Sequence, residues 1–256
     1  MMSEFEIKIT KDRGEIREAQ KLRFEVFNLE MKKGLESSYK RGLDTDDYDP
    51  LCDHLIVRDL NNRKVVGTYR LLLGSEACKH FGFYSEGEFD LANIKKLNGE
   101  LLELGRSCAH KHYRDRALIS SMWDAIADYV TTHKVRYLFG CASLLTTHPR
   151  EVSEFFSYLK KRYYAPEQFR VHPIPEKSFP NLVENVKIRD GQSVFLRLPS
   201  LIKGYLRIGA LLCGPPALDL DFGTTDLFLL LDFNQMSNEY RRRFSFLKSK
   251  VKNAVA

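Results

Sequence analysis

Residues 103–108 read Glu103-Leu104-Gly105-Arg106-Ser107-Cys108 and follow the apolar pair Leu101-Leu102. The apolar flank predicts a buried strand that carries both an acid and a guanidinium group. Because side chains alternate along a strand, Glu103 and Arg106 are expected on opposite faces. A glycine inside a strand usually marks a bulge, and a bulge here could turn both charged side chains into one cleft.

A basic loop and a helix follow this strand. The loop spans residues 110–116 and holds five basic or histidine side chains, and residues 117–133 place apolar side chains at helical spacing. The loop therefore opens a helix N-terminus, where backbone N–H groups and the helix dipole favour an anion.

In this order, the strand, the splayed backbone, the anion loop and the helix resemble the thioester-binding core of the Gcn5-related N-acyltransferases. Residues with the order and spacing seen in the acyl-homoserine lactone synthases, which use an acyl carrier protein as donor, are Arg23, Phe27, Asp46, Asp49, Arg70, Glu103 and Arg106. The second half resembles bacterial ornithine-acyl carrier protein N-acyltransferases and their haemolysin-like relatives, through blocks at 198–210, 213–217 and 221–226. The resemblance covers nearly the whole chain.

The resemblance implies an α/β fold with a mixed, mostly antiparallel sheet, splayed central parallel strands and flanking helices. We expect one acyltransferase domain over 1–256, with the thioester-binding and catalytic core in 1–148 and with 149–256 completing the sheet and forming an acyl pocket. The apolar patterns predict strands or sheet segments at 5–9, 54–59, 64–73, 100–109, 136–144, 192–198 and 226–232. They predict helices at 14–31, 117–133, 149–164 and 200–209.

Composition sets the class of protein. A chain of 256 residues can bury a core without disulfide or metal support. Its five cysteines are widely spaced and form no C-x-x-C pair, which favours a reducing cytoplasm. The N-terminus lacks the apolar region of a secretory signal, and no apolar run approaches the roughly 20 residues that span a bilayer. We expect a cytoplasmic protein, with peripheral contact with the inner membrane as an option, and without bound cofactor or metal.

The net charge of +6 and the pI near 9.0 suit an acidic partner. Nucleic acid is the least favoured partner, because basic residues alternate with acids and no recognised binding motif is present. An anionic membrane or a small acidic protein remains, and a basic cluster can also be only a solvated face. The resemblance names the acyl carrier protein as partner and an amino acid as acceptor.

Acyl transfer from a thioester to an amine needs a proton acceptor and donors for the oxyanion. Glu103 is our candidate for holding or deprotonating the amine, because an apolar cleft raises the pKa of a carboxylate. The alternative is a structural ion pair of Glu103 with Arg106 or Arg70. These two arginines could bind the acceptor's carboxylate in bidentate geometry, or could pair with Asp46 or Asp49.

The other candidate residues follow from the resemblance or from position. The basic side chains of the loop suit the acidic surface of a carrier protein, since the loop lacks the glycines that would wrap the pyrophosphate of coenzyme A. Ser143 is chosen because related folds place a substrate-contacting hydroxyl at the mouth of the next strand. The substrate candidates are Arg23, Phe27, Asp46, Asp49, Arg70 and Ser143, and the donor candidates are Ser107, Cys108, Lys111, Arg114 and Arg116.

Four further features have a structural alternative to a functional role. Direct attack is favoured over an acyl-enzyme on Cys108 or Cys141, because no histidine has a motif that ties it to either thiol. His54 begins an apolar strand, so a core histidine is expected rather than a metal ligand. The segment 198–212 could line an acyl pocket, rest on a membrane or cover the core. The acids at 219, 221 and 226 are interpreted as a tight polar turn.

These observations predict an N-acyltransferase that moves a long acyl group, with or without a 3-hydroxyl, from acyl carrier protein to the α-amine of an amino acid such as ornithine. The product would be a lyso-lipoamino acid. One alternative is a signal synthase of the acyl-homoserine lactone type acting on S-adenosylmethionine, against which the extra C-terminal blocks argue. The other is a non-enzymatic, membrane-active haemolysin-like protein, against which the absence of a signal peptide and of a spanning segment argues.

Overall fold

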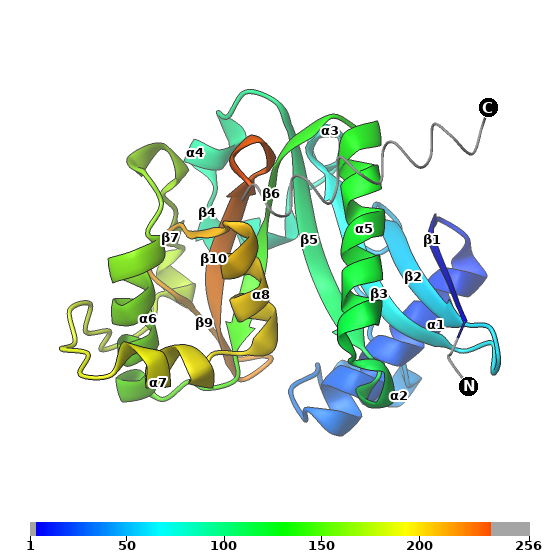
Figure 1. Ribbon diagram of the computed structural model, residues 1–256, viewed down its shortest axis with the longest axis horizontal. Coiled ribbons are helices and arrows are strands. Elements are labelled where there is room, and N and C mark those ends of the chain that lie inside the picture. Colours follow the sequence, from blue (N-terminus) through cyan, green and yellow to red (C-terminus); the bar gives the residue numbers. More distant parts are fainter. Residues whose placement is uncertain (1–3, 237–256) are drawn as a thin grey trace. The chain divides into compact units, whose positions relative to one another are not determined.

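The computed structural model describes residues 4–236, apart from the side chain of Arg116. This part of the chain divides into two compact units, and each unit is interrupted in sequence. The first comprises residues 4–81 and 100–135, and the second comprises 82–99 and 136–236 (Figure 1). The single domain expected over 1–256, with its division at residue 148, stays a prediction.

An antiparallel sheet forms the first unit. Its strands pair in the order β1 (Phe5–Thr10), β2 (Asp53–Asp59), β3 (Val65–Leu73) and β5 (Glu100–Ala109). The helix α1 (Arg13–Phe24) contacts β3 and β5, and α5 (Arg116–Thr132) contacts β1 and β2. Figure 1 shows α5 running lengthwise along the strands. β3 is buried over nearly its whole length, as expected of a strand with both faces covered.

The first helix shows why a charged residue enters this core. Asp12 caps α1 by accepting a hydrogen bond from the backbone N–H of Glu15. Ala19, Leu22 and Arg23 then face inward at helical spacing, so Arg23 lies on the apolar side of the helix. The helix predicted over 14–31 continues as a π-helical segment (Glu25–Glu30) and is followed by α2 (Ser37–Arg41).

The predicted bulge is present in β5. The register passes from Thr68 opposite Cys108 to Arg70 opposite Gly105, so β5 has one residue more than β3 in this interval. Arg106 has a φ angle of 49°, a left-handed conformation that is uncommon for a residue other than glycine. The bulge therefore reorients the backbone at the guanidinium-bearing residue.

The second unit contains two antiparallel sheets. β6 (Val135–Leu144) pairs with β10 (Thr224–Asp232), which also pairs with β8 (Leu211–Leu212) and β9 (Ala217–Asp219). β4 (Phe89–Asp90) pairs with β7 (His172–Pro173). The longer helices are α6 (Pro149–Tyr163), α7 (Gly191–Arg197) and α8 (Ser200–Ile208). Short helices and turns are α3 (Gly74–Ala77), α4 (Ala92–Lys95) and the 3₁₀ segments Tyr84–Gly87, Lys111–Tyr113, Glu167–Phe169, Pro175–Lys177 and Phe233–Gln235.

The sheet segment predicted at 192–198 is wrong, because this stretch forms the helix α7. The carboxylate of Asp190 accepts hydrogen bonds from the backbone N–H groups of Gln192 and Ser193, which caps the helix. Val194 and Leu198, four residues apart, are buried in one core cluster. The cap and this spacing outweigh the strand-like composition.

The helix predicted near 200–209 is present as α8, and it packs on the core. Ile202 and Leu206, four residues apart, are buried with Phe156 and Leu227, as the core-helix interpretation expects. Gly209 ends the helix with a φ angle of 106°, which a residue with a side chain rarely adopts. An acyl pocket in this half stays a prediction. Among the described residues, no helix has both the length and the apolar character that crossing a bilayer requires.

Candidate functional site

A buried network of charged side chains lies in the first unit, and Arg23 is its centre. Arg23 has no exposed surface. Its Nε donates to Oδ1 of Asp44 at 2.9 Å, and its Nη1 and Nη2 donate to the two carboxylate oxygens of Asp49 at 2.9 and 2.8 Å. Nη2 also donates to the backbone carbonyl of Asp44 at 2.6 Å. The planar guanidinium therefore ties α1 to the loop 44–49 at several points.

Asp46 carries the network onward to the two strand arginines. Its Oδ1 accepts from Nη1 of Arg70 at 2.5 Å, and its Oδ2 accepts from Nη2 of Arg106 at 3.3 Å. Arg70 also lies 3.3 Å from Asp49, and Nε of Arg106 lies 3.6 Å from Oδ1 of Asp44. The bulge thus brings Arg106 to the carboxylate that holds Arg70. Both arginines form the aspartate pairs that the sequence analysis gave as the alternative to substrate binding.

The network keeps Asp46, Asp49 and Arg70 ionised. Burial opposes the charge of Asp46, but the attraction of Arg70 and its hydrogen bond outweigh burial and hold the pKa of Asp46 below its ordinary value. Burial also opposes the charge of Asp49, but the hydrogen bonds and the charge of Arg23 outweigh it, so the pKa of Asp49 lies below its ordinary value as well. Burial likewise opposes the charge of Arg70, yet Asp46 keeps the pKa of Arg70 above its ordinary value.

His54 and the nearby thiols are neutral at pH 7. Nε2 of His54 lies 2.9 Å from the backbone carbonyl of Asp49, and burial lowers the pKa of this histidine. His54 is therefore the buried, hydrogen-bonded histidine that was expected. Burial raises the pKa of Cys52 and of Cys108 to about 12 in each case. Because the thiolate is the nucleophilic form, the raised pKa of Cys108 argues against an acyl-enzyme on this thiol.

Glu103 is buried on β5, close to this network. It pairs with Leu72, and Gly105 pairs with Arg70, so Glu103 and Arg70 project from the same face of the sheet. Burial is the main cause of the raised pKa of Cys52, and the negative charge of Glu103 raises it further. Glu103 is a carboxylate on the face of the sheet that also carries Arg70.

The basic loop differs in part from the expected anion site. Asp115 caps α5, since its carboxylate accepts from the backbone N–H of Leu118 at 2.7 Å. Arg114 is exposed, but its two terminal nitrogens each lie 2.7 Å from a carboxylate oxygen of Glu30. Lys111 is exposed and, with Leu29, lines a pocket of about 270 Å³. The chain's own carboxylate therefore occupies the N-terminus of α5, and Lys111 borders a cavity.

The other candidates are distributed over both units. Phe27, in the π-helical segment, and Cys108 are partly buried and pack on the same apolar cluster. Ser107 is half-buried within the bulge. Ser143 lies in the second unit, where its hydroxyl donates to Asp226. The side chain of Arg116 lies outside the described residues. The substrate, donor and catalytic roles of all these residues stay predictions.

Sequence reasoning missed Asp44 and Tyr48. Asp44 has no exposed surface and bonds Arg23, while the ring of Tyr48 lies 5.6 Å from the guanidinium carbon of Arg70. The available signal was four aspartates within residues 44–49, a density that invites a search for buried cations. The sequence pattern alone does not distinguish the buried aspartates from Asp47, which is exposed.

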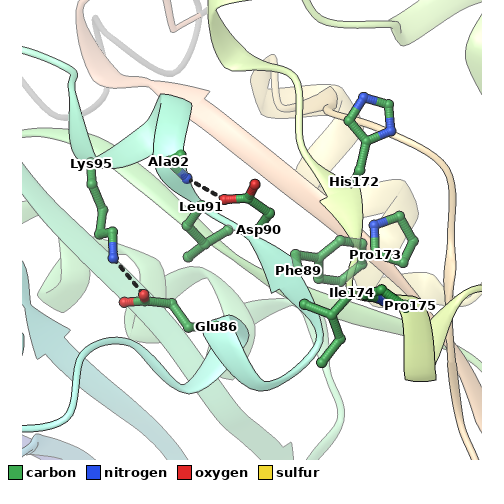
Figure 2. Close-up of a pocket in the computed structure, with 10 residues that line it drawn as sticks. All are labelled: Glu86, Phe89, Asp90, Leu91, Ala92, Lys95, His172, Pro173, Ile174 and Pro175. Carbon is green, nitrogen blue, oxygen red and sulfur yellow. Dashed lines mark hydrogen bonds and ion pairs between the residues drawn. The ribbon is translucent and has the colours of Figure 1, made fainter.

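A separate pocket of about 500 Å³ opens in the second unit beside the paired strands β4 and β7, which line it together with neighbouring residues (Figure 2). Phe89, Pro173 and Ile174 supply apolar lining. At one side, Lys95 and Glu86 form an ion pair of 2.6 Å, shown as a dashed line in Figure 2. The candidates chosen from the sequence do not line this pocket.

Comparison with known proteins agrees with this architecture. A family model described as an acetyltransferase (GNAT) domain matches residues 22–124. The structure is similar to FeeM, an N-acyl amino acid synthase from uncultured soil microbes, with a TM-score of 0.52 and 10% identity over 91% of this chain and 93% of that one. It is also similar to the CoA-dependent acyl-homoserine lactone synthase BjaI, with a TM-score of 0.51 and 13% identity over 91% and 85% of the two chains. The predicted fold class is confirmed: the protein has the α/β fold of the Gcn5-related acyltransferases.

Two curated proteins are similar over most of their length. The L-ornithine N(alpha)-acyltransferase of Brucella abortus is 35% identical, with 92% of this chain and 86% of the relative covered. The protein of the same name from Rhodobacter capsulatus is 34% identical, with 94% and 95% covered. The chain belongs to the family of L-ornithine N(alpha)-acyltransferases. It is an acyltransferase, which takes an acyl donor and an amino acid acceptor.

The network predicts the effect of removing one buried charge. Asp49→Asn leaves the Arg23 charge without its bidentate partner and should lower the free energy of unfolding at pH 7 by about 3 kcal/mol or more, measured by urea denaturation. The folded-state pKa of Asp49 lies below the ordinary 3.8. The stabilisation that ionised Asp49 gives to the folded state is therefore complete above pH 3.8 and is lost as pH falls through the folded-state pKa. The difference in free energy of unfolding between wild type and Asp49→Asn should therefore narrow below about pH 4.

Asp47→Asn is the matched control, because Asp47 is an exposed acid in the same loop. It should change the free energy of unfolding by less than about 0.5 kcal/mol. Equal effects of the two substitutions would contradict the importance of the buried pairs.

Proposed function

We propose that this protein transfers a long fatty acyl group to the α-amine of ornithine and so forms a lyso-lipoamino acid. One observation carries the proposal: a buried carboxylate, Glu103, shares a sheet face with Arg70, and Arg106 meets Arg70 at Asp46. A carboxylate suits an ammonium group, and paired guanidinium groups suit a carboxylate. These are the two charged groups that every α-amino acid presents. The name of the curated relatives supports ornithine as the particular acceptor.

In the proposed reaction, Glu103 accepts a proton from the acceptor's ammonium group. The neutral amine then attacks the carbonyl carbon of the thioester, a C–N bond forms, and the C–S bond breaks. The thiolate of the donor's phosphopantetheine arm leaves and takes up the proton that the attacking nitrogen loses on becoming an amide. Asp46 orients Arg70 and Arg106 throughout, and therefore acts as a positioning residue, as do Arg23 and Asp49, which are enclosed within the network.

For the donor, we propose an acyl carrier protein. Exposed Lys111 beside a pocket, and a chain with a net charge of +6, suit an acidic protein surface. The loop also offers few backbone donors for a pyrophosphate, since Asp115 caps the helix that follows. The single phosphodiester on the carrier protein's phosphopantetheine arm needs fewer backbone hydrogen-bond donors than the pyrophosphate of coenzyme A does.

Peripheral contact with the inner membrane, from the cytoplasmic side, is part of the same proposal. It rests on two exposed leucines, Leu196 on α7 and Leu201 on α8, whose exposed fractions are 64% and 38%. Such side chains suit the interface at which an acylated product partitions. Membership of an enzyme family argues against the non-enzymatic, haemolysin-like alternative.

The proposed role of Glu103 predicts the result of Glu103→Gln. The purified protein is supplied with ornithine and a long-chain acyl carrier protein, and amide formation is followed by mass spectrometry. Wild type should form N-acylornithine, and the variant should lose about 10²-fold or more in kcat with thermal unfolding unchanged, because a positioned base contributes this much. Glu100→Gln is the matched control on the same strand, since the carboxylate of Glu100 accepts from the backbone N–H of Ser75 and an amide oxygen can do the same. Undiminished turnover of folded Glu103→Gln, or no amide from wild type, would refute the proposal.

The proposed donor predicts that Lys111→Glu discriminates between two substrates. The KM for acyl carrier protein should rise about tenfold, and this effect should shrink at high salt, because rim charges act through screened electrostatics. For the same acyl group on a minimal pantetheine thioester, Lys111→Glu should have the same KM as wild type. Lys187→Glu alters net charge equally at an exposed position in the second unit and should change neither donor. An equal loss with both donors would show that Lys111 serves something other than the carrier protein.

A further inference from the structure

Three buried carboxylates meet in the second unit. Glu88, Asp219 and Asp226 are each about 95% buried. One carboxylate oxygen from each lies within 4.8 Å of the others. The sequence predicts Asp219 and Asp226 to be part of a tight polar turn, and it gives no sign of a metal. Glu88 is remote in sequence, so this grouping is a product of the fold.

The strand register explains how the aspartates come together. Asp226 on β10 pairs with Ala217 on β9, and Thr224 pairs with Asp219. Paired residues and residues two apart on a strand share a face, so both carboxylates project to one side. Glu88 follows the 3₁₀ turn Tyr84–Gly87, and its carbonyl accepts from the backbone N–H of Ile174. Backbone hydrogen bonds thus hold all three residues in place.

Two of the three carboxylates in this cluster have no cationic side chain as a partner among the described residues. Lys177 lies 3.8 Å from Asp219, and within residues 4–236 neither Glu88 nor Asp226 forms an ion pair. Oε2 of Glu88 is buried and, among the described residues, accepts no hydrogen bond. Burial and the repulsion of Asp226 and Asp219 raise the pKa of Glu88. A buried carboxylate oxygen without a hydrogen bond costs stability, and here it belongs to a side chain that is grouped with two other carboxylates, as the ligands of a cation are.

We propose that Glu88, Asp219 and Asp226 bind one hard divalent cation of the Ca²⁺, Mn²⁺ or Mg²⁺ class. The donor atoms are all oxygens, which these cations prefer over softer metals. Two oxygens on opposite sides of such an ion lie about 4–5 Å apart, twice a bond length of about 2.1–2.5 Å. The 4.8 Å limit on the three oxygens satisfies this spacing.

The cation acts on the structure of the second unit. Oδ1 of Asp219 accepts from the backbone N–H groups of Asp221 and Phe222, which shapes the turn between β9 and β10. The hydroxyl of Ser143, on β6, donates to Asp226. An ion at the three carboxylates therefore joins this turn and β10 to the segment that precedes β4. The inference is independent of the proposed acyl transfer.

The test is metal binding by the full-length protein after treatment with EDTA, without donor or acceptor. Isothermal titration with Mn²⁺, Ca²⁺ and Mg²⁺ separately should show one site per chain for at least one of these ions. At a hundredfold excess over Kd, that ion should raise the Tm by about 5–10 °C, since a ligand that binds only the folded state stabilises it. Glu88→Gln and Asp226→Asn should each weaken binding about a hundredfold or more, and they should abolish the rise in Tm.

Asp221→Asn is the matched control, because the side chain of Asp221 is 73% exposed and lies in the same turn. It should bind the ion as wild type does. Absence of binding at millimolar concentrations of all three ions would overturn the proposal and indicate carboxylates that share a proton. An equal loss of affinity in Asp221→Asn and Asp226→Asn would overturn it as well, since it would indicate diffuse surface binding. Two cluster variants are used so that a folding failure in one leaves the other to decide.

Discussion

A buried guanidinium requires anionic partners, because an uncompensated buried charge is strongly destabilising, and Arg23 has no exposed surface. Its bonds to Asp44 and Asp49 satisfy this requirement and at the same time fix a loop that has little regular structure of its own. Asp46 lies within that loop, so its position is set by its neighbours. Through Asp46, the constraint on Arg23 reaches Arg70 and Arg106, which are the groups we assign to the acceptor. The order of the site therefore derives from one buried charge on the first helix.

The bulge at Arg106 is the second requirement. In a regular strand, successive residues face opposite sides of the sheet, so the side chain of Arg106 would lie on the face opposite to Arg70 and Glu103. The extra residue and the positive φ angle of Arg106 remove that restriction. A left-handed conformation at such a residue costs about 1–3 kcal/mol, and the ion pairs with Asp44 and Asp46 offset the cost. The same network thus supports the backbone strain at Arg106.

The sequence predicted the parts of the fold that local pattern controls. The strand at 100–109, its bulge and the helix after the basic loop followed from apolar spacing and from Gly105. The stretch 192–198 was misjudged, because the cap at Asp190 decides its helical state and apolar composition does not. Asp44 and the grouping of Glu88 with Asp219 and Asp226 depend on tertiary contacts between distant segments, which no local pattern reports. Local secondary structure was therefore easier to predict than the tertiary partners of individual side chains.

The central claim is that Asp46 serves the acceptor site through Arg106, and a double-mutant cycle on kcat/KM for ornithine tests it most directly. The cycle compares Asp46→Asn, Arg106→Gln and the double variant, each checked for an unchanged thermal unfolding transition. If Asp46 acts partly by orienting Arg106, the effects should be non-additive, so that the loss in the double variant is smaller than the product of the two single losses. Losses in the double variant that multiply, as for two independent residues, would contradict the account.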